Sequence, residues 1–264
     1  MNARAYWAVV SARYRMLLQY RAAALAGFVT QLFWGAIKLM VFAAFFSVSP
    51  QEQPLSLTDI VAYVWLGQAL LGLLPWNVDQ EIAEKIRTGD VAYELLRPLD
   101  LYTFWFFRTI AFRCAATTLR MIPMILFAMV LLPVVGLEAW ALKPPDLDSG
   151  LLFALSMTVT VLLATAITMV MHISLVWTIS GEGFNRMMPG ITSILSGMIV
   201  PLPLFPDWLQ PFLNWQPFRG LCDVPYRIYT GNITAADALP EIAQQFGWVI
   251  LIVAFGYWLL SVST

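Results

Sequence analysis

The sequence predicts an all-α integral membrane protein with six transmembrane helices. Of its 264 residues, 60% are hydrophobic and only 12% are charged, and the mean hydropathy is +0.73. Soluble domains are about half apolar and about a quarter charged, so this chain has more apolar side chains than a soluble core would bury. The apolar residues form runs of about 20, the length of a helix that crosses a bilayer. The short alternating segments of a β-barrel are not found in the sequence.

Residues 1–21 are expected to form an amphipathic helix on the membrane surface. Tyr6, Val10, Tyr14 and Leu17 follow helical spacing, with four arginines beside them. An apolar face next to basic residues is typical of a helix at the bilayer interface. The alternative is a frayed soluble tail. A cleavable signal peptide is not expected, because the first apolar run is about 25 residues long and lacks a cleavage site.

Six apolar segments follow, and each is expected to cross the bilayer once. The fourth is longer than a bilayer requires, so we expect it to tilt or to project beyond the hydrocarbon. The segments are 22–46, 58–77, 104–133, 150–178, 187–204 and 242–262. The whole chain, 1–264, is interpreted as one transmembrane domain.

The positions of lysine and arginine predict the orientation of these segments. Eight basic residues lie in the N-terminal stretch and in the loops 79–100 and 179–190, whereas the alternate loops together contain three. Cytoplasmic loops carry an excess of positive charge. Both termini are therefore expected in the cytoplasm.

The loop 80–98 is expected to form two short helices under the membrane. Ile82 and Ile86 share a helical face, and Gly89 is suited to end the first helix because it adopts positive φ readily. Asp90 is expected to cap the second helix. This loop therefore presents charged side chains on the cytoplasmic side.

The segment 201–240 is expected to form broken half-helices on the outer side. Six prolines between 201 and 225 prevent one continuous helix. Trp208, Phe212 and Trp215 are spaced i, i+4, i+7, so a short helix here would have an aromatic face, which suits the headgroup level. We expect a re-entrant or interfacial element before the last span.

The sequence lacks the common catalytic motifs. It contains no GxxxxGK[ST] phosphate loop, no HExxH and no GxSxG. Cys114 and Cys222 are far apart and predict neither a metal site nor a disulfide framework. No catalytic residue and no metal ligand is predicted.

Polar side chains within the apolar segments are candidates for a translocation path, because charges in a bilayer are costly. Lys38 lies about two-thirds along the first segment, and Gln31 precedes it by two turns. The alternative for Lys38 is that its side chain extends to the outer interface. Arg120 requires a partner helix, a carboxylate or a water-filled cavity. His172, the one histidine, is the fourth candidate, with hydrogen-bonded packing as the alternative.

Three stretches resemble an ABC-2 type exporter permease, of the subgroup in which two permease chains are encoded beside one ATPase. They are IRTGDVAYELLRPLDLY at 86–102, PLPLFPDWLQPFLNWQPF at 201–218 and DVPYRIYTGNIT at 223–234. The predicted order of elements is similar to the same family over nearly the whole chain. The C-terminal LLSVST departs from it, because the family's chains end in a basic tail.

The resemblance implies a role for each irregular element. The helix 1–21 would be the connecting elbow, the loop 80–98 would be the coupling helix seated on a cytoplasmic ATPase dimer, and 201–240 would form the external gate. The gate residues would be Trp208, Phe212 and Trp215. The residues that would couple to the ATPase are Glu81, Glu84, Lys85, Arg87, Gly89, Asp90 and Glu94.

The implied function is ATP-driven export across the inner membrane of a bacterium. The chain would form the substrate path with a second ABC-2 permease, and the subgroup favours an unlike partner over an identical one. ATP and Mg²⁺ would bind at the partner ATPase, with no cofactor on this chain and no nucleic-acid partner. The alternative is an ion- or proton-driven secondary carrier, which the scarcity of acidic residues in the apolar segments disfavours. Drug-like compounds, lipids and glycans all stay open as substrates.

Overall fold

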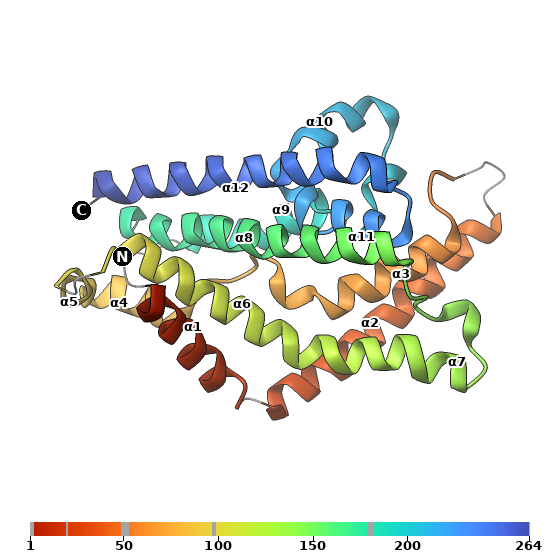
Figure 1. Ribbon diagram of the computed structural model, residues 1–264, viewed down its shortest axis with the longest axis horizontal. Helices are drawn as coiled ribbons and strands as arrows, with labels where there is room; N and C mark the ends of the chain where they lie inside the picture. Colours follow the sequence, from red (N-terminus) through yellow and green to blue (C-terminus); the bar gives the residue numbers. More distant parts are fainter. Residues whose placement is uncertain (1–2, 20, 49–52, 97–98, 179–181, 264) are drawn as a thin grey trace.

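The computed structural model describes residues 3–19, 21–48, 53–96, 99–178 and 182–263, which are mostly helical and contain no strand. Figure 1 shows long helices running along the molecule, with α4 (Gln80–Thr88) and α5 (Val91–Leu95) at one end. The start of α1 (Ala3–Leu17) and the end of α12 (Ala235–Ser263) lie at the same end, which we name the termini end. The predicted all-α class is confirmed.

Within the described residues, four helical stretches are long and apolar enough to cross a membrane. They are Ala24–Val48, Leu101–Val134, Leu147–Thr178 and Ala235–Val262. The first lies in α2 (Arg21–Val48), the third is α8 (Leu147–Thr178), and the fourth lies in α12. The second comprises α6 (Leu101–Leu126), a π-helical turn (Phe127–Leu131) and α7 (Leu132–Val134).

The second and fifth expected spans are shorter helices. α3 (Leu57–Ala69) has 13 residues and α9 (Glu182–Leu195) has 14. At 1.5 Å per residue each is about 20 Å long, whereas the hydrocarbon of a bilayer is about 30 Å thick. The count of six spans therefore stays a prediction.

The fifth expected span, 187–204, is not one continuous helix in the structure. α9 ends at Leu195, and Gly197 then adopts a left-handed φ of +83°. The backbone N of Asp223 donates to the carbonyl of Ser196 (3.2 Å), so another part of the chain satisfies a carbonyl at this helix end. Prolines at 201 and 203 then prevent the helix from resuming.

α3 ends where the chain approaches α6 closely. It begins at a capping box, in which Ser56 and Asp59 exchange side-chain and backbone hydrogen bonds. It ends before Gly72, where a Cβ would lie 3.0 Å from the backbone N of Thr117 on α6. The absence of a side chain at Gly72 therefore permits the chain to pass close to α6.

α1 packs along α6. The ring of Tyr6 is buried and stacks on Phe107 at a centroid distance of 5.2 Å, and the hydroxyl of Tyr14 donates to Oγ1 of Thr118 (3.0 Å). Trp7 is 72% exposed. The helix predicted in 1–21 is thus present from 3 to 17, while residues 1–2 and 20 lie outside the described part.

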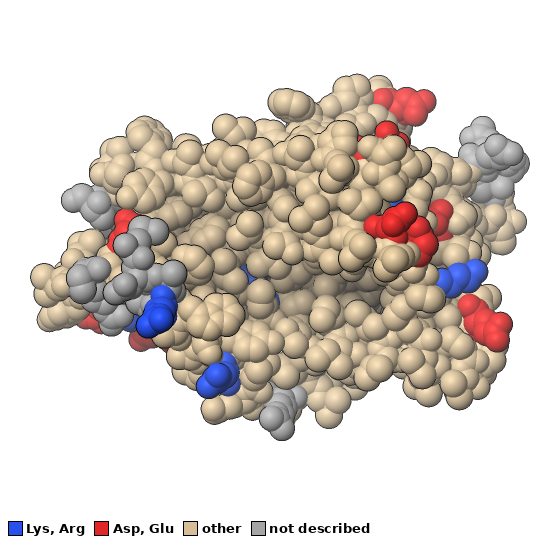
Figure 2. All heavy atoms as spheres, in the orientation of Figure 1, with Lys and Arg blue, Asp and Glu red and all other residues tan. Residues whose placement is uncertain are grey.

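The segment before α12 is broken, as the prolines predict. Its longest pieces are α10 (Gln210–Trp215) and α11 (Asp223–Thr230), with turns of 3₁₀-helix between Leu202 and Leu221. α12 begins at Ala235, earlier than the predicted 242. On the face shown in Figure 2, most charged side chains lie towards the two ends of the molecule, and the middle is largely uncharged.

Candidate functional site

α4 lies at the termini end and begins at Asp79. The carboxylate of Asp79 accepts a hydrogen bond from the backbone N of Glu81 (3.1 Å) and so caps the first turn. Ile82 is fully buried, as its place on the apolar face predicts. Gly89 ends the helix with a φ of +81°, which confirms the predicted glycine stop.

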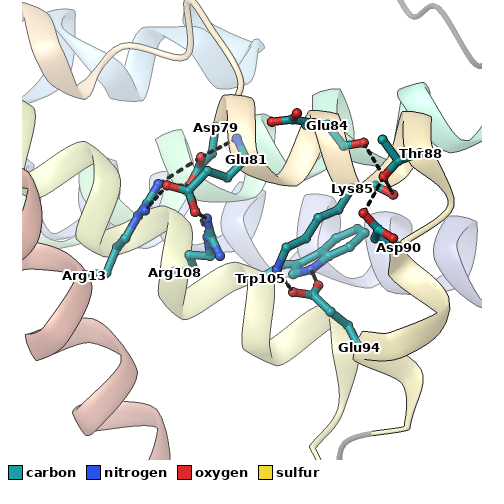
Figure 3. A network of polar contacts seen from close by, with 10 residues as sticks. All are labelled: Arg13, Asp79, Glu81, Glu84, Lys85, Thr88, Asp90, Glu94, Trp105 and Arg108. Atoms are coloured by element: carbon teal, nitrogen blue, oxygen red, sulfur yellow. Dashed lines mark hydrogen bonds and ion pairs between the residues drawn. The ribbon is translucent and has the colours of Figure 1, made fainter.

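Two arginines from other helices meet the carboxylates at the start of α4 (Figure 3). Arg13 of α1 donates to Asp79 (3.0 Å to Oδ2) and to Glu81. Arg108 of α6 donates to Asp79 (3.2 Å) and to Glu81. The side chains of both arginines are 10% exposed and that of Asp79 is 2% exposed. Removing one member would leave a poorly solvated charge, so α4 is firmly joined to α1 and α6.

The chain that leads into α4 is held by α6 and α8. Nε2 of His172 on α8 accepts a hydrogen bond from the backbone N of Asp79 (2.9 Å). Arg113 on α6 donates to the carbonyl of Leu74 (2.8 Å) and to Oδ1 of Asn77 (3.0 Å). His172 and Arg113 are both buried. Four helices, α1, α4, α6 and α8, therefore meet at this junction.

Glu81 has a lowered pKa at this junction. Partial desolvation raises its pKa, but the hydrogen bonds and charges of Arg13 and Arg108 together outweigh that effect. Glu81 is therefore ionised at neutral pH and keeps its attraction for both arginines. Its side chain is 52% exposed, so solvent screens part of this attraction.

A second ion pair holds α5 against α4 and α6 (Figure 3). Glu94 is 3% exposed and accepts hydrogen bonds from Lys85 of α4 and from Nε1 of Trp105 (2.7 Å) on α6. Burying one carboxylate between two donors fixes the angle between the two short helices. α4 and α5 are thus one structural unit.

The predicted capping of α5 by Asp90 is wrong. The carboxylate of Asp90 accepts a hydrogen bond from Oγ1 of Thr88 (2.8 Å), and no side-chain cap bond forms. The backbone of Asp90 is helical (φ −66°, ψ −7°), whereas a capping residue is typically extended. The Asp90 carboxylate thus accepts a hydrogen bond from the Thr88 hydroxyl instead of from a backbone N–H of α5.

The outer surface of α4 and α5 is open. Three charged residues on it, Glu84, Arg87 and Asp90, are exposed. Large apolar side chains lie beside them: Tyr93 is 71% exposed and Leu96 is 81% exposed. A mixed charged and apolar surface next to a rigid junction is suited to bind another protein.

The sequence model of a family described as ABC-2 family transporter protein matches residues 32–263. The chain belongs to this family. Membership implies a multi-pass membrane protein that is the transport subunit of an ABC transporter and associates with an ATPase. No curated protein and no solved structure matches the chain.

In this ABC-2 protein the seven predicted coupling residues fall into two groups. Glu81, Lys85 and Glu94 pair with residues of the same chain, so they position the loop. The exposed group consists of Glu84, Arg87, Gly89 and Asp90. The charges of the loop predict a polar surface, but they do not show that Glu81 is paired, because its partners Arg13 and Arg108 lie on α1 and α6.

The four residues of the predicted path do not converge on one cavity. His172 lies at the junction with Asp79, near the end of α8. Lys38 donates to the carbonyl of Met198 (3.0 Å), and Gln31 is buried on the same helix. Arg120 extends across to α2. None of the four lines the cavity of about 310 Å³ between α3, α6 and α8.

The three aromatic residues of the predicted gate are on the surface of the broken segment. Trp208 is 79% exposed, Phe212 is 55% exposed and Trp215 is 68% exposed. Trp215 also contacts Trp248 of α12, edge to face, at a centroid distance of 6.1 Å. Trp208 lies in a 3₁₀ turn (Asp207–Leu209) and the other two lie in α10, so the single aromatic face and its role as a gate stay predictions.

Sequence reasoning missed an ion cluster away from the termini end. Asp223 is fully buried and accepts hydrogen bonds from Arg219 (3.2 Å) and Arg227 (3.3 Å). Arg219 also donates to Glu241 of α12 (2.6 Å). The signal in the sequence was the i, i+4, i+8 spacing of Arg219, Asp223 and Arg227, which places opposite charges on one helical face. Among the described residues, no group of three or more His, Cys, Asp or Glu could hold a metal ion.

Proposed function

We propose that this chain is the permease subunit of an ATP-driven exporter in the inner membrane of a bacterium. In this proposal the termini end faces the cytoplasm, and α4 with α5 seats on a cytoplasmic ATPase dimer that binds ATP and Mg²⁺. α1 is the connecting elbow at the inner interface. A second ABC-2 permease, unlike or identical, completes the substrate path.

The observation that carries the proposal is the junction at the start of α4. Asp79 contacts Arg13 of α1, Arg108 of α6 and His172 of α8 through hydrogen bonds. A displacement of α4 is therefore transmitted to three other helices through polar contacts. The contacts with Arg13 and Arg108 are ion pairs, and the contact with His172 is a neutral hydrogen bond. Rigid-body shifts of packed helices are a common way for proteins to transmit such motions.

The strength of the junction supports its use as a rigid lever. Breaking a buried ion pair by removing one partner destabilises a protein by about 3–5 kcal/mol. Separating α4 from α1 and α6 would likewise leave these charges without partners, which favours movement of the three helices together. An ATPase that closes on ATP would move the unit of α4 and α5 together with the attached spans.

The exposed side of α4 and α5 is the proposed ATPase contact. Arg87 and Glu84 would supply the polar part, and Tyr93 and Leu96 would supply the apolar part. Charged residues at such a rim set the rate and orientation of docking more than the affinity. On the outer side, the broken segment with Trp208 and Phe212 would form the gate.

Site-specific photocrosslinking in native membranes tests this proposal. A photoreactive amino acid at Arg87 or Tyr93 is expected to give an adduct with a protein that contains a Walker-A motif. The same residue at Trp208, equally exposed but on the broken segment, is the matched control and is expected to give no such adduct. Adducts at Trp208 but not at Arg87 would reverse the orientation, and no ATPase adduct from any position would refute the proposal.

A further inference from the structure

A small polar pocket lies at the termini end, between the start of α6 and the end of α12. It has a volume of about 200 Å³, and Leu95 of α5 forms part of its wall. Its polar atoms come from Asp100 and Tyr102 at the start of α6 and from Tyr257 and Ser261 on α12. The pocket shares no residue with the junction at the start of α4.

The one charged group among the described residues that line the pocket is the carboxylate of Asp100. Its Oδ2 accepts hydrogen bonds from the backbone N (2.7 Å) and the hydroxyl (2.6 Å) of Thr103, and its Oδ1 accepts one from the hydroxyl of Tyr257 (3.1 Å). In the described part of the chain, no lysine or arginine pairs with Asp100. A carboxylate oxygen can accept two hydrogen bonds, so Oδ1 has room for a second donor.

The hydroxyls of the pocket also offer acceptors. The hydroxyl of Tyr257 donates to Asp100 and that of Ser261 donates to the carbonyl of Trp258 (2.7 Å), which leaves both oxygens free to accept. Tyr102 is 4% exposed, and its hydroxyl has no hydrogen-bond partner among the described residues. A buried hydroxyl without a partner is rare and requires an explanation. A ligand with several N–H donors would match this set of acceptors.

Two aromatic rings lie beside the carboxylate. The ring centroids of Tyr102 and Tyr257 are 5.4 Å apart, and the ring planes are tilted by 59°. Tyrosine rings attract cations, and aromatic rings are the usual walls of sites for ammonium groups. An anion would be repelled by Asp100, and an apolar group would leave the acceptors without partners. The chemistry of the pocket therefore favours an ammonium.

The pocket lies where lipid head groups are expected. Tyr257 is 50% exposed and Trp258 is 58% exposed, and both are in the last two turns of the span Ala235–Val262. Such rings prefer the level of the head groups. Phe246 and Ile250 are also exposed, and their i, i+4, i+11 spacing with Tyr257 places all three within about 40° around α12. An exposed apolar track thus extends over about 16 Å from the pocket towards the middle of the span.

We propose that this pocket binds the primary ammonium of a lipid head group, such as that of phosphatidylethanolamine, with an acyl chain along Phe246 and Ile250. The ammonium donates to Oδ1 of Asp100 and to the hydroxyl oxygen of Tyr257. These two atoms are 3.1 Å apart, so one ammonium reaches both. The lipid would then join the start of α6 to the end of α12. This site does not depend on the export function proposed above.

Native mass spectrometry of the purified full-length chain in mild detergent tests the proposal with three lipids that have the same acyl chains. They are phosphatidylethanolamine, its N-acetylated form, which has no positive charge, and phosphatidylcholine, which keeps the charge but has no N–H. Phosphatidylethanolamine is expected to bind at least about tenfold more tightly than the N-acetylated lipid, with phosphatidylcholine between them. Equal binding of phosphatidylethanolamine and its N-acetylated form would overturn the proposal. Phosphatidylcholine that binds as tightly as phosphatidylethanolamine would overturn the assignment of a hydrogen-bonded ammonium.

Substitutions in the pocket separate recognition from folding. Asp100→Asn keeps an oxygen that can cap α6 but removes the charge, so it is expected to abolish the preference for phosphatidylethanolamine. Asp148→Asn makes the same change at an exposed position in the first turn of α8, away from this pocket, and is expected to leave the preference unchanged. Tyr257→Phe keeps the ring but removes one acceptor, and is expected to reduce the preference about threefold. An unchanged preference in Asp100→Asn, or an equal loss in Asp148→Asn, would overturn the proposal.

Two further comparisons identify the source of the ammonium. The soluble head group glycerophosphoethanolamine lacks the acyl chains, so it is expected to displace the lipid only in large excess. Competition by the soluble head group at the concentration of the lipid would assign the pocket to a soluble amine. The lipid is also expected to stay bound when the chain is in complex with its ATPase, and its loss on assembly would assign the pocket to a lysine of the partner. Either result would overturn the lipid site and leave the exporter intact, since binding to the chain alone requires no ATPase.

Discussion

Substitutions at Asp79 distinguish its two roles at the start of α4, which are to cap the helix and to pair with two arginines. Asp79→Asn keeps an oxygen that can accept the cap hydrogen bond from Glu81 but removes the charge that faces Arg13 and Arg108. A hydrogen bond to a charged group contributes about 1.5–3 kcal/mol. Because Glu81 still pairs with both arginines, we expect a loss near the lower end, about 2 kcal/mol.

Asp79→Ala also removes the cap, which contributes about 1 kcal/mol more. The expected order of stability is wild type, then Asp79→Asn, then Asp79→Ala, with a total loss of about 3 kcal/mol. Reversible unfolding in mixed micelles of mild and denaturing detergent measures these differences.

Asp100 provides the matched control, because its carboxylate caps α6 by accepting from the backbone N of Thr103 (2.7 Å) but has no arginine partner in the described structure. Asp100→Asn is expected to change the free energy of unfolding by less than about 0.5 kcal/mol. If Asp79→Asn and Asp100→Asn destabilise equally, the arginine contacts add nothing and the reasoning about the junction is refuted.

Three further predictions concern the same region and its approach. Glu94→Gln should release α5, since it weakens a buried charged contact, and proteolysis after Tyr93 should accelerate; an unchanged cleavage rate would contradict the role of the pair. The pKa of Glu81 is lowered from 4.5, so its contribution is complete above about pH 4.5 and is lost as pH falls through the folded-state pKa. If the stability of Glu81→Gln falls with decreasing pH in the same way as that of the wild type, this prediction is contradicted. Gly72→Ala, where a Cβ meets backbone, should destabilise by about 1–3 kcal/mol, whereas Gly247→Ala, where a Cβ meets nothing within 4 Å, should be neutral or stabilising; equal effects of the two would contradict the close approach.

The sequence predicts the elements of this fold where local chemistry determines them. Gly89 follows a short amphipathic segment, and its left-handed conformation follows from the preference of glycine for helix ends. The prolines between 201 and 225 likewise predict a broken segment, since each removes a backbone donor. The helical spacing around Tyr6 predicts the helix α1, but it was interpreted as a membrane-facing side and did not predict that Tyr6 stacks on Phe107 of α6.

The contacts between distant helices were not predictable from one sequence. α3 ends at Ala69, and Gly72 and Pro75 are local signals for that end, but the sequence does not indicate that Gly72 lies against Thr117 of α6. Arg13 was expected among the basic residues at the membrane surface, but it pairs with Asp79 and Glu81, which lie more than 60 residues away. A hydropathy profile shows where charged residues lie along the chain. Which of these charges form ion pairs depends on which helices pack together in the fold.

Purification of the tagged chain from its native membranes in mild detergent tests the central claim most directly. Every protein that co-purifies is identified and quantified by mass spectrometry. The account predicts a stoichiometric ATPase with a Walker-A motif, with or without a second permease chain, and a reduced yield of that ATPase when Arg87 and Tyr93 on the outer surface of α4 and α5 are replaced by alanine. A chain that is purified without an ATPase and transports without ATP would contradict the account and would favour an ion- or proton-driven carrier.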